Sequence, residues 1–219
     1  LVEQYPDDLE AHQALAEMAV ANGDWEVAQR YATEAVRLQP ENPTLLAIKA
    51  AADYGRAAQG DDTAGVVDAM KRVKAMLEQD PKNILLRRVI IDDLLRAQDF
   101  EDALPEIDAA IALEPKDRQL FAQRMAVLSA LGDDAAVEAG LIDMVAQFPE
   151  SPEMSETLTR WYVSRNQLDK AEAHLRSRID LAKPEVGPVF SLVRFLAEHR
   201  GTKSAADELD KVIAAGGTS

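Results

Sequence analysis

Prolines recur in this sequence at a fixed interval. Pro6 and Pro40 are 34 residues apart, and the same interval separates Pro81 from Pro115 and Pro115 from Pro149. Each proline ends an amphipathic run, as expected of a residue that cannot continue a helix. A period of about 20 to 50 residues is typical of repeat proteins, in which each unit buries its apolar face against its neighbours. The sequence therefore predicts an array of stacked repeats.

One interval departs from the period. Pro40 and Pro81 are 41 residues apart, so the second repeat holds an insertion of 7 residues. The insertion coincides with the polar segment at residues 60–63, Gly-Asp-Asp-Thr. We expect a longer turn at this position.

A second break divides each repeat near its middle, at residues 21–24, 97–99, 131–133 and 165–167. These breaks combine glycine or asparagine, which allow a left-handed residue at a helix end, with aspartate, which caps a helix start. Each repeat is therefore predicted to be two antiparallel helices joined by a short turn. Small or modest side chains that allow the helices to approach closely recur in the second helices. They are Ala28, Ala103, Val137 and Ala171.

The clearest repeat spans residues 9–42, and its most characteristic residues are Leu15, Ala16, Gly23, Asp24, Trp25, Ala28, Ala32, Ala35 and Pro40. On these residues the chain resembles the tetratricopeptide repeat (TPR) family, in particular bacterial chains with many repeats. Weaker copies follow along nearly the whole chain. The resemblance implies an all-α fold: a right-handed α-solenoid of antiparallel helix pairs, with about twelve helices and an N-terminal stub.

The chain departs from the family pattern in four places. Lys49 and Met76 occupy positions where the family favours apolar or small residues. Pro105 falls within a second helix, where it removes one hydrogen bond and should bend the third unit. The last unit, at residues 185–215, matches weakly and is interpreted as a degenerate helix pair that caps the array.

We predict a single solenoid domain over residues 1–215. Its repeats are residues 7–42, 43–82, 83–116, 117–150 and 151–184, followed by the helix pair 185–215 and a tail at 216–219. Residues 1–6 have the form of the end of a second helix whose partner is missing, which suggests a longer protein. Cutting inside a repeat leaves an apolar edge, so we expect this edge to fray or to pair with another molecule.

Charge limits the possible partners. The formal net charge is -15, with 39 acidic and 24 basic residues. Nucleic acid and anionic membrane surfaces are disfavoured, because both are bound through clustered lysine and arginine. No apolar run approaches the roughly 18 residues of a membrane-spanning helix, so direct membrane insertion is not expected.

The sequence carries no catalytic signature. Cysteine is absent, and His12, His174 and His199 lie outside any metal-ligand motif. The paired aspartates at residues 7–8, 61–62 and 133–134 are interpreted as helix caps, whereas the pair at 92–93 lies within a first helix. We therefore predict no enzymatic activity, no cofactor and no metal.

The TPR resemblance implies that the first helices line a concave face that binds peptides. Helical spacing assigns seventeen positions to that face. They are Glu10, Gln13, Glu17, Ala47, Ala51, Tyr54, Leu85, Arg88, Asp92, Leu95, Arg96, Gln119, Ala122, Ala126, Glu153, Glu156 and Arg160.

These positions suggest how a guest is held. The alanines would leave room for its side chains, Arg88 and Arg96 would bind a carboxylate, and Glu10 and Glu17 would bind a basic residue. An alternative is that Arg88 with Asp92, and Glu156 with Arg160, form intrahelical ion pairs.

The sequence thus predicts a protein-interaction scaffold that binds a peptide or protein segment in its concave groove. The alternatives are a self-assembling structural segment that associates through its N-terminal edge, and an accessory region of a larger envelope or biosynthesis-complex protein. The partner is not identified. The compartment stays open between cytoplasm and periplasm, with the periplasm slightly favoured.

Overall fold

The computed structural model describes residues 7–180 and 185–215. The predicted N-terminal stub at residues 1–6, the last four residues of the fifth repeat and the tail at 216–219 lie outside the described residues. So do the predictions made for the N-terminal edge.

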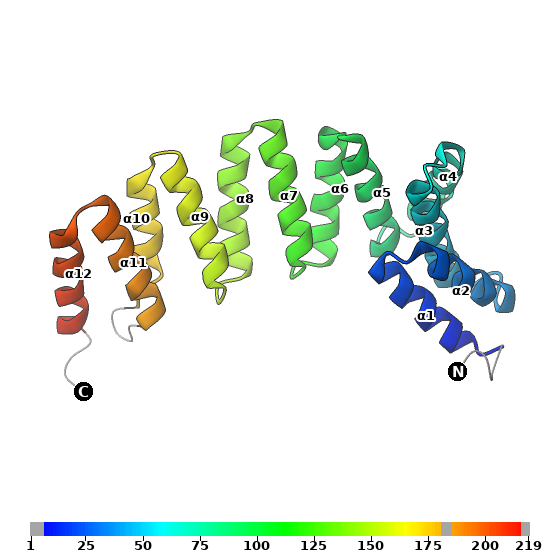
Figure 1. Cartoon of the computed structure of the whole chain (residues 1–219), viewed down its shortest axis with the longest axis horizontal. Helices are drawn as coiled ribbons and strands as arrows, with labels where there is room; N and C mark the ends of the chain where they lie inside the picture. Colours follow the sequence, from blue (N-terminus) through cyan, green and yellow to red (C-terminus); the bar gives the residue numbers. More distant parts are fainter. Residues whose placement is uncertain (1–6, 181–184, 216–219) are drawn as a thin grey trace. The chain divides into compact units, whose positions relative to one another are not determined.

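The described part of the chain contains twelve α-helices and no strand (Figure 1), which confirms the expected all-α class of helix pairs. The helices are α1 Leu9–Asn22, α2 Trp25–Leu38, α3 Pro43–Gln59, α4 Thr63–Gln79, α5 Ile84–Ala97, α6 Phe100–Leu113, α7 Arg118–Leu131, α8 Asp134–Gln147, α9 Pro152–Ser164, α10 Leu168–Ser177, α11 Val186–His199 and α12 Thr202–Ala215.

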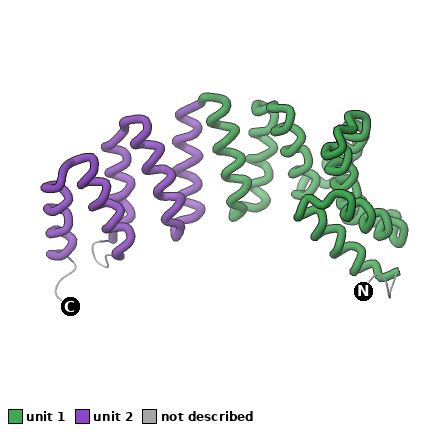
Figure 2. Tube along the Cα trace, viewed as in Figure 1, with its two compact units in different colours: residues 1–132 green, residues 133–219 purple. Residues whose placement is uncertain are grey.

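The chain divides into two compact units (Figure 2), here called unit 1, residues 1–132, and unit 2, residues 133–219. The division falls inside the fourth predicted repeat, between α7 and α8. A single domain over residues 1–215 stays a prediction. Within unit 1, consecutive helices from α1 to α7 pack side by side, and α3 also contacts α1 and α5. Within unit 2, α8 to α12 pack in the same sequential manner.

Short turns and side-chain caps set the helix limits. Gly23, with φ of 72°, and Gly132, with φ of 73°, end α1 and α7 in the left-handed conformation. Asp8, Asp62 and Asp133 cap α1, α4 and α8 by accepting hydrogen bonds from backbone N–H groups. Each of these three aspartates is a member of one of the predicted pairs at residues 7–8, 61–62 and 133–134. The interpretation of these pairs as helix caps is therefore confirmed.

The 7-residue insertion lies mostly within helices. Helices α3 and α4 have 17 residues each, against 14 in each helix of the first and third repeats. The turn between α3 and α4, residues 60–62, is one residue longer than the turn between α1 and α2. The turn is therefore longer, as expected, but by one residue only, and the other six residues of the insertion lengthen the two helices. Three extra residues add nearly one helical turn, so both helices grow while each keeps its apolar face in register.

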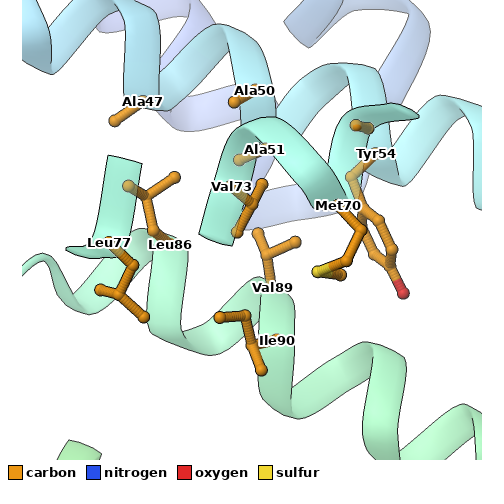
Figure 3. Packing of buried hydrophobic residues seen from close by; sticks show 11 residues of the cluster. Ala47, Ala50, Ala51, Tyr54, Met70, Val73, Leu77, Leu86, Val89 and Ile90 are labelled. Carbon is orange, nitrogen blue, oxygen red and sulfur yellow. The ribbon is translucent and has the colours of Figure 1, made fainter. Parts of the chain in front are cut away.

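The core of the lengthened repeat is built by α3, α4 and α5 (Figure 3). Val73 on α4 and Val89 on α5 lie close together in its centre, and Met70 lies beside the ring of Tyr54. Small side chains on α3, among them Ala50, let the neighbouring helices approach. Met76 packs against this cluster and is only partly buried.

The small residues predicted at the close crossings are buried. Ala28, Ala103, Ala171 and Val137 all lie in the core of their units. Pro105 is accommodated within α6, which continues from Phe100 to Leu113; the predicted bend stays a prediction.

Candidate functional site: the groove of unit 1

A groove of about 640 Å³ opens on unit 1. It is lined mainly by α1, α3, α5 and α7, the first helices of their pairs. We call it the unit-1 groove. Its lining residues are Glu17, Val20, Ala21, Asn22, Gly23, Trp25, Ile48, Ala51, Leu85, Arg88, Val89, Ile91, Asp92, Gln119 and Gln123.

The floor of the unit-1 groove is apolar. Val20 from α1, Ile48 from α3, and Leu85 and Val89 from α5 contribute aliphatic side chains, and Trp25 contributes its indole ring. The four aliphatic residues also pack into the cores behind the groove, so this part of the floor is held by buried contacts rather than by flexible side chains. A preformed apolar floor of this kind suits an apolar side chain of a guest.

Two carboxylates stand on the walls. Glu17 on α1 is exposed and accepts a hydrogen bond of 2.8 Å from the Nε2 of Gln13. Asp92 on α5 is accessible to solvent, yet protein atoms surround it on several sides. This partial loss of hydration raises the pKa of the Asp92 carboxyl, although the charges of Arg96 and Arg88 act in the opposite direction. Neither Glu17 nor Asp92 forms an ion pair within residues 7–180 and 185–215.

Arg88 is already bonded to carboxylates of its own unit. Its Nη2 donates to Glu114 at 2.7 Å and also to Asp117, the N-cap of α7. Partial burial of Arg88 lowers its pKa, but these hydrogen bonds outweigh the burial and raise it. The predicted role of Arg88 in binding a guest carboxylate stays a prediction. The alternative, an intrahelical ion pair with Asp92, is wrong, because Arg88 pairs with Glu114 and Asp117 instead.

The structure places the seventeen positions predicted for the concave face in several different surroundings. Six of them lie together in the unit-1 groove: Glu17, Ala51, Leu85, Arg88, Asp92 and Gln119.

Three of the predicted positions offer almost no free surface. Ala47, Ala51 and Tyr54 are 2%, 1% and 3% exposed, respectively. Ala47 packs with residues of α4 and α5 and does not line the groove, whereas Ala51 does line it. The expectation that these alanines leave room for a guest stays a prediction. The Tyr54 hydroxyl donates to Asp93 at 3.1 Å, and this bond explains one member of the aspartate pair at 92–93.

The other unit-1 positions lie outside the lining of the groove. They are Glu10, Gln13, Leu95, Arg96, Ala122 and Ala126. Ala122 and Ala126 are exposed on α7, and Arg96 lies 5.7 Å from the centroid of the Tyr54 ring, in a cation–π arrangement.

Unit 2 has a smaller cleft of about 320 Å³ between α9 and α11. Glu156 and Arg160 line it, whereas Glu153 does not. The predicted pair of Glu156 with Arg160 is replaced by a contact of 3.6 Å between Glu156 and Arg194 of α11. The Nη2 of Arg160 instead donates to the Oγ1 of Thr157 at 3.4 Å.

Sequence reasoning missed several lining residues of the unit-1 groove, notably Val20, Ile48 and Gln123. Gln123 lies four residues after Gln119, whereas the sequence assignment stepped three residues to Ala122. Both steps fit a helix of 3.6 residues per turn, so spacing alone does not decide between them. The apolar character of Val20 and Ile48 could have suggested that they line a groove, but the same character is expected of ordinary core residues.

Another cavity of unit 1, about 730 Å³, is lined by residues of α2, α3, α4 and the start of α5. The carboxylate of Asp53 organises the polar side of this cavity. It accepts hydrogen bonds from Lys49 at 2.7 Å, from Gln29 at 2.9 Å and from Arg72 at 3.4 Å. Lys49, unusual for the family, is thus accounted for by an ion pair.

Unit 2 also brings a serine and a histidine together, a pair that sequence reasoning did not find. The Oγ of Ser155 lies 2.8 Å from the Nε2 of His174. Burial, together with the charge of Arg178, lowers the pKa of His174. Ser155 is buried, however, and it lines neither the unit-2 cleft nor the unit-1 groove. A serine nucleophile must reach a substrate, so we interpret the pair as a structural contact between α9 and α10.

Within the described residues, no group of three His, Cys, Asp or Glu side chains is placed to hold a metal ion. None of the described helices combines the length and the apolar character needed to cross a membrane.

No family model matches the sequence, and no curated protein matches it. Solved structures do resemble its fold. The Naa15/Naa10 complex bound to HypK-THB matches with a TM-score of 0.61 at 17% identity, over 92% of this chain and 30% of that one. PilF of Pseudomonas aeruginosa matches with a TM-score of 0.57 at 13% identity, over 91% of this chain and 88% of that one. MamA of Desulfovibrio magneticus RS-1 matches with a TM-score of 0.50 at 16% identity, over 94% of each chain. PilF and MamA are TPR proteins.

This chain has the TPR fold. The TPR resemblance of the sequence is thereby confirmed, and it explains why the first helices share one face. At these identities the likeness concerns the fold alone. The chain also spans only 30% of the Naa15/Naa10 chain that it matches.

Proposed function

We propose that this TPR chain is a protein-interaction scaffold and that it holds a segment of another protein in the unit-1 groove. The observation that carries the proposal is the groove itself, which joins side chains from α1, α3, α5 and α7 around an apolar floor. A site assembled from four helices suits an extended or helical segment, because such a segment contacts several repeats at once.

Two observations support binding rather than catalysis. The charged side chains of the groove do not form a nucleophile–base pair, and the serine of the serine–histidine pair in unit 2 is buried. In addition, one structure with the same fold, Naa15/Naa10, is a complex with a bound partner, HypK-THB.

A selection experiment tests the proposal. The full chain is used to select binders from a displayed library of random peptides of about 12 residues, and enriched peptides are resynthesised. The same peptides are then measured against a variant whose groove is filled by Gln119→Trp and Gln123→Trp. Gln59→Trp, at the exposed end of α3 and outside the groove lining, is the matched control.

We expect the filled variant to lose at least about tenfold in affinity, because the indole rings occupy the space of the guest. The control should bind as the unchanged chain does. Failure to enrich any peptide, or equal binding by the filled variant, would overturn the proposal.

A further inference from the structure

The unit-1 groove carries more negative than positive charge. Residues 1–132 hold 24 acidic and 14 basic side chains, which amounts to two thirds of the formal charge of the whole chain. In the groove lining, Glu17 and Asp92 face a single arginine, Arg88. A concave surface with low-dielectric walls concentrates such a field and attracts ligands of opposite charge.

Within the described residues, the arginine of the groove forms no ion pair with either acid. Arg88 attracts Asp92 electrostatically, but its hydrogen bonds go to Glu114 and Asp117, which lie outside the groove lining. Arg96, four residues after Asp92, attracts that carboxylate electrostatically, but it lies over the Tyr54 ring and forms no ion pair within the described residues. The acids of the groove are therefore available to a guest.

The positions of Glu17 and Asp92 define the spacing that two basic residues of a guest would need. Glu17 is on α1 and Asp92 is on α5, and both helices pack against α3, which supplies Ile48 to the floor between them. Packed helices are about 8 to 10 Å apart, so two steps from α1 to α5 cover about 16 to 20 Å. An extended segment, at roughly 3.3 Å per residue, crosses this distance in about five or six residues.

We infer that the partner is a protein segment with an apolar side chain flanked by two basic residues, about five residues apart. The apolar side chain lies on the floor formed by Val20, Ile48, Leu85 and Val89. One basic residue binds Glu17 and the other binds Asp92. This inference rests on the proposed function, because it names the chemistry of the segment held in the same groove.

The peptide selection described above also tests this inference. Peptides enriched on the full chain should carry a net positive charge, with lysine or arginine on both sides of an aliphatic or aromatic residue. Raising the ionic strength from about 50 mM to about 500 mM should weaken a resynthesised peptide about tenfold, since exposed charges are screened over a few Å at high salt. Enrichment of neutral or acidic peptides that the filled variant no longer binds would overturn this inference and leave the proposed function standing.

Two matched variants localise the effect. Glu17→Gln with Asp92→Asn removes two negative charges from the groove, and we expect about a tenfold loss of affinity for the enriched peptide. Glu78→Gln with Glu101→Gln removes two negative charges from exposed positions outside the groove lining and should change affinity by less than about threefold. Equal losses in both variants would show a general effect of net charge and would overturn the assignment to Glu17 and Asp92.

A charge reversal gives an independent readout. The variant Glu17→Lys with Asp92→Lys should select acidic peptides from the same library, because the walls then present cations over an unchanged floor. Selection of the original basic peptides by this variant would contradict the inference. Circular dichroism of each variant shows whether the helices are retained.

Discussion

The indole ring of Trp25 packs directly on the backbone of α3 at Gly55. A Cβ placed on residue 55 would lie 2.2 Å from the Cδ2 atom of Trp25, closer than any real contact. Gly55 is buried within the 17-residue helix α3, and glycine inside a helix costs about 1 kcal/mol relative to alanine. The space that Trp25 needs explains this glycine, and Trp25 in turn lines the unit-1 groove.

We therefore expect Gly55→Ala to destabilise the protein by about 1 to 3 kcal/mol, since the steric cost exceeds the gain in helix propensity. Urea unfolding followed by circular dichroism measures this change. Gly187→Ala in α11 is the matched control, because a Cβ there meets no atom within 4 Å. The control should be neutral or slightly stabilising, and a similar loss in both variants would contradict the explanation.

The turn between α5 and α6 uses a left-handed residue that is not glycine. Gln98 has φ of 58°, a conformation that costs a residue with a Cβ about 1 kcal/mol or more. Gln98→Gly should therefore stabilise the protein by about 0.5 to 1 kcal/mol. Gln79→Gly, at the last residue of α4, should instead destabilise it by a similar amount, because the backbone of Gln79 does not have positive φ. A loss of stability in both variants would argue against strain at Gln98.

An ion pair between a buried glutamate and a partly exposed arginine joins α10 to α12. The Nη1 of Arg176 lies 2.7 Å from the Oε1 of Glu208, whose side chain is 8% exposed. Removing the arginine leaves a buried carboxylate with only the longer contact of 3.6 Å to Lys211. We expect Arg176→Met to weaken the hydrogen-exchange protection of α12 by about 1 to 2 kcal/mol.

The double variant Arg176→Met with Glu208→Met tests the cause of that loss. It should recover most of the protection, because neither charge is then buried without a partner. If the double variant is no better protected than Arg176→Met alone, the ion pair does not account for the docking of α12.

The partial burial of His174 should make the stability of unit 2 sensitive to pH. Because burial lowers the pKa of His174 below its ordinary value of about 6.5, the unfolded chain binds this proton more readily than the folded chain. Stability should therefore be complete above about pH 6.5 and fall as the pH drops below that value. His174→Asn keeps a polar partner for Ser155 and does not titrate. Between about pH 7.5 and pH 5, the His174→Asn variant should lose less unfolding free energy than the unchanged chain. An equal loss would show that other groups cause the pH dependence of stability.

The helix pairs could be predicted from the sequence because the signals that define them are local. The prolines, Gly23 and Gly132 stop helices, and Asp8, Asp62 and Asp133 start them through hydrogen bonds to neighbouring backbone N–H groups. These interactions span three or four residues, so the sequence alone determined the period, the turns and the all-α class.

The groove was predicted only in part, because helical spacing gives a stripe of residues but not its rotation about the helix axis. Stepping from Gln119 to Ala122 was as reasonable as stepping to Gln123, and only the packing of α7 against its neighbours decided which faces the groove. Ala47 and Tyr54 were assigned to the open face, but α4 and α5 cover them.

Tertiary structure also decided which charged side chains form ion pairs. Helical spacing offers Asp92 as the partner of Arg88, yet Arg88 bonds to Glu114 and Asp117, which are 26 and 29 residues away in sequence. No local rule pairs residues so far apart. The sequence by itself determined the repeated helix pairs through short-range hydrogen bonds and backbone sterics, whereas the groove and its unneutralised acids exist only because packing between repeats brings distant side chains together.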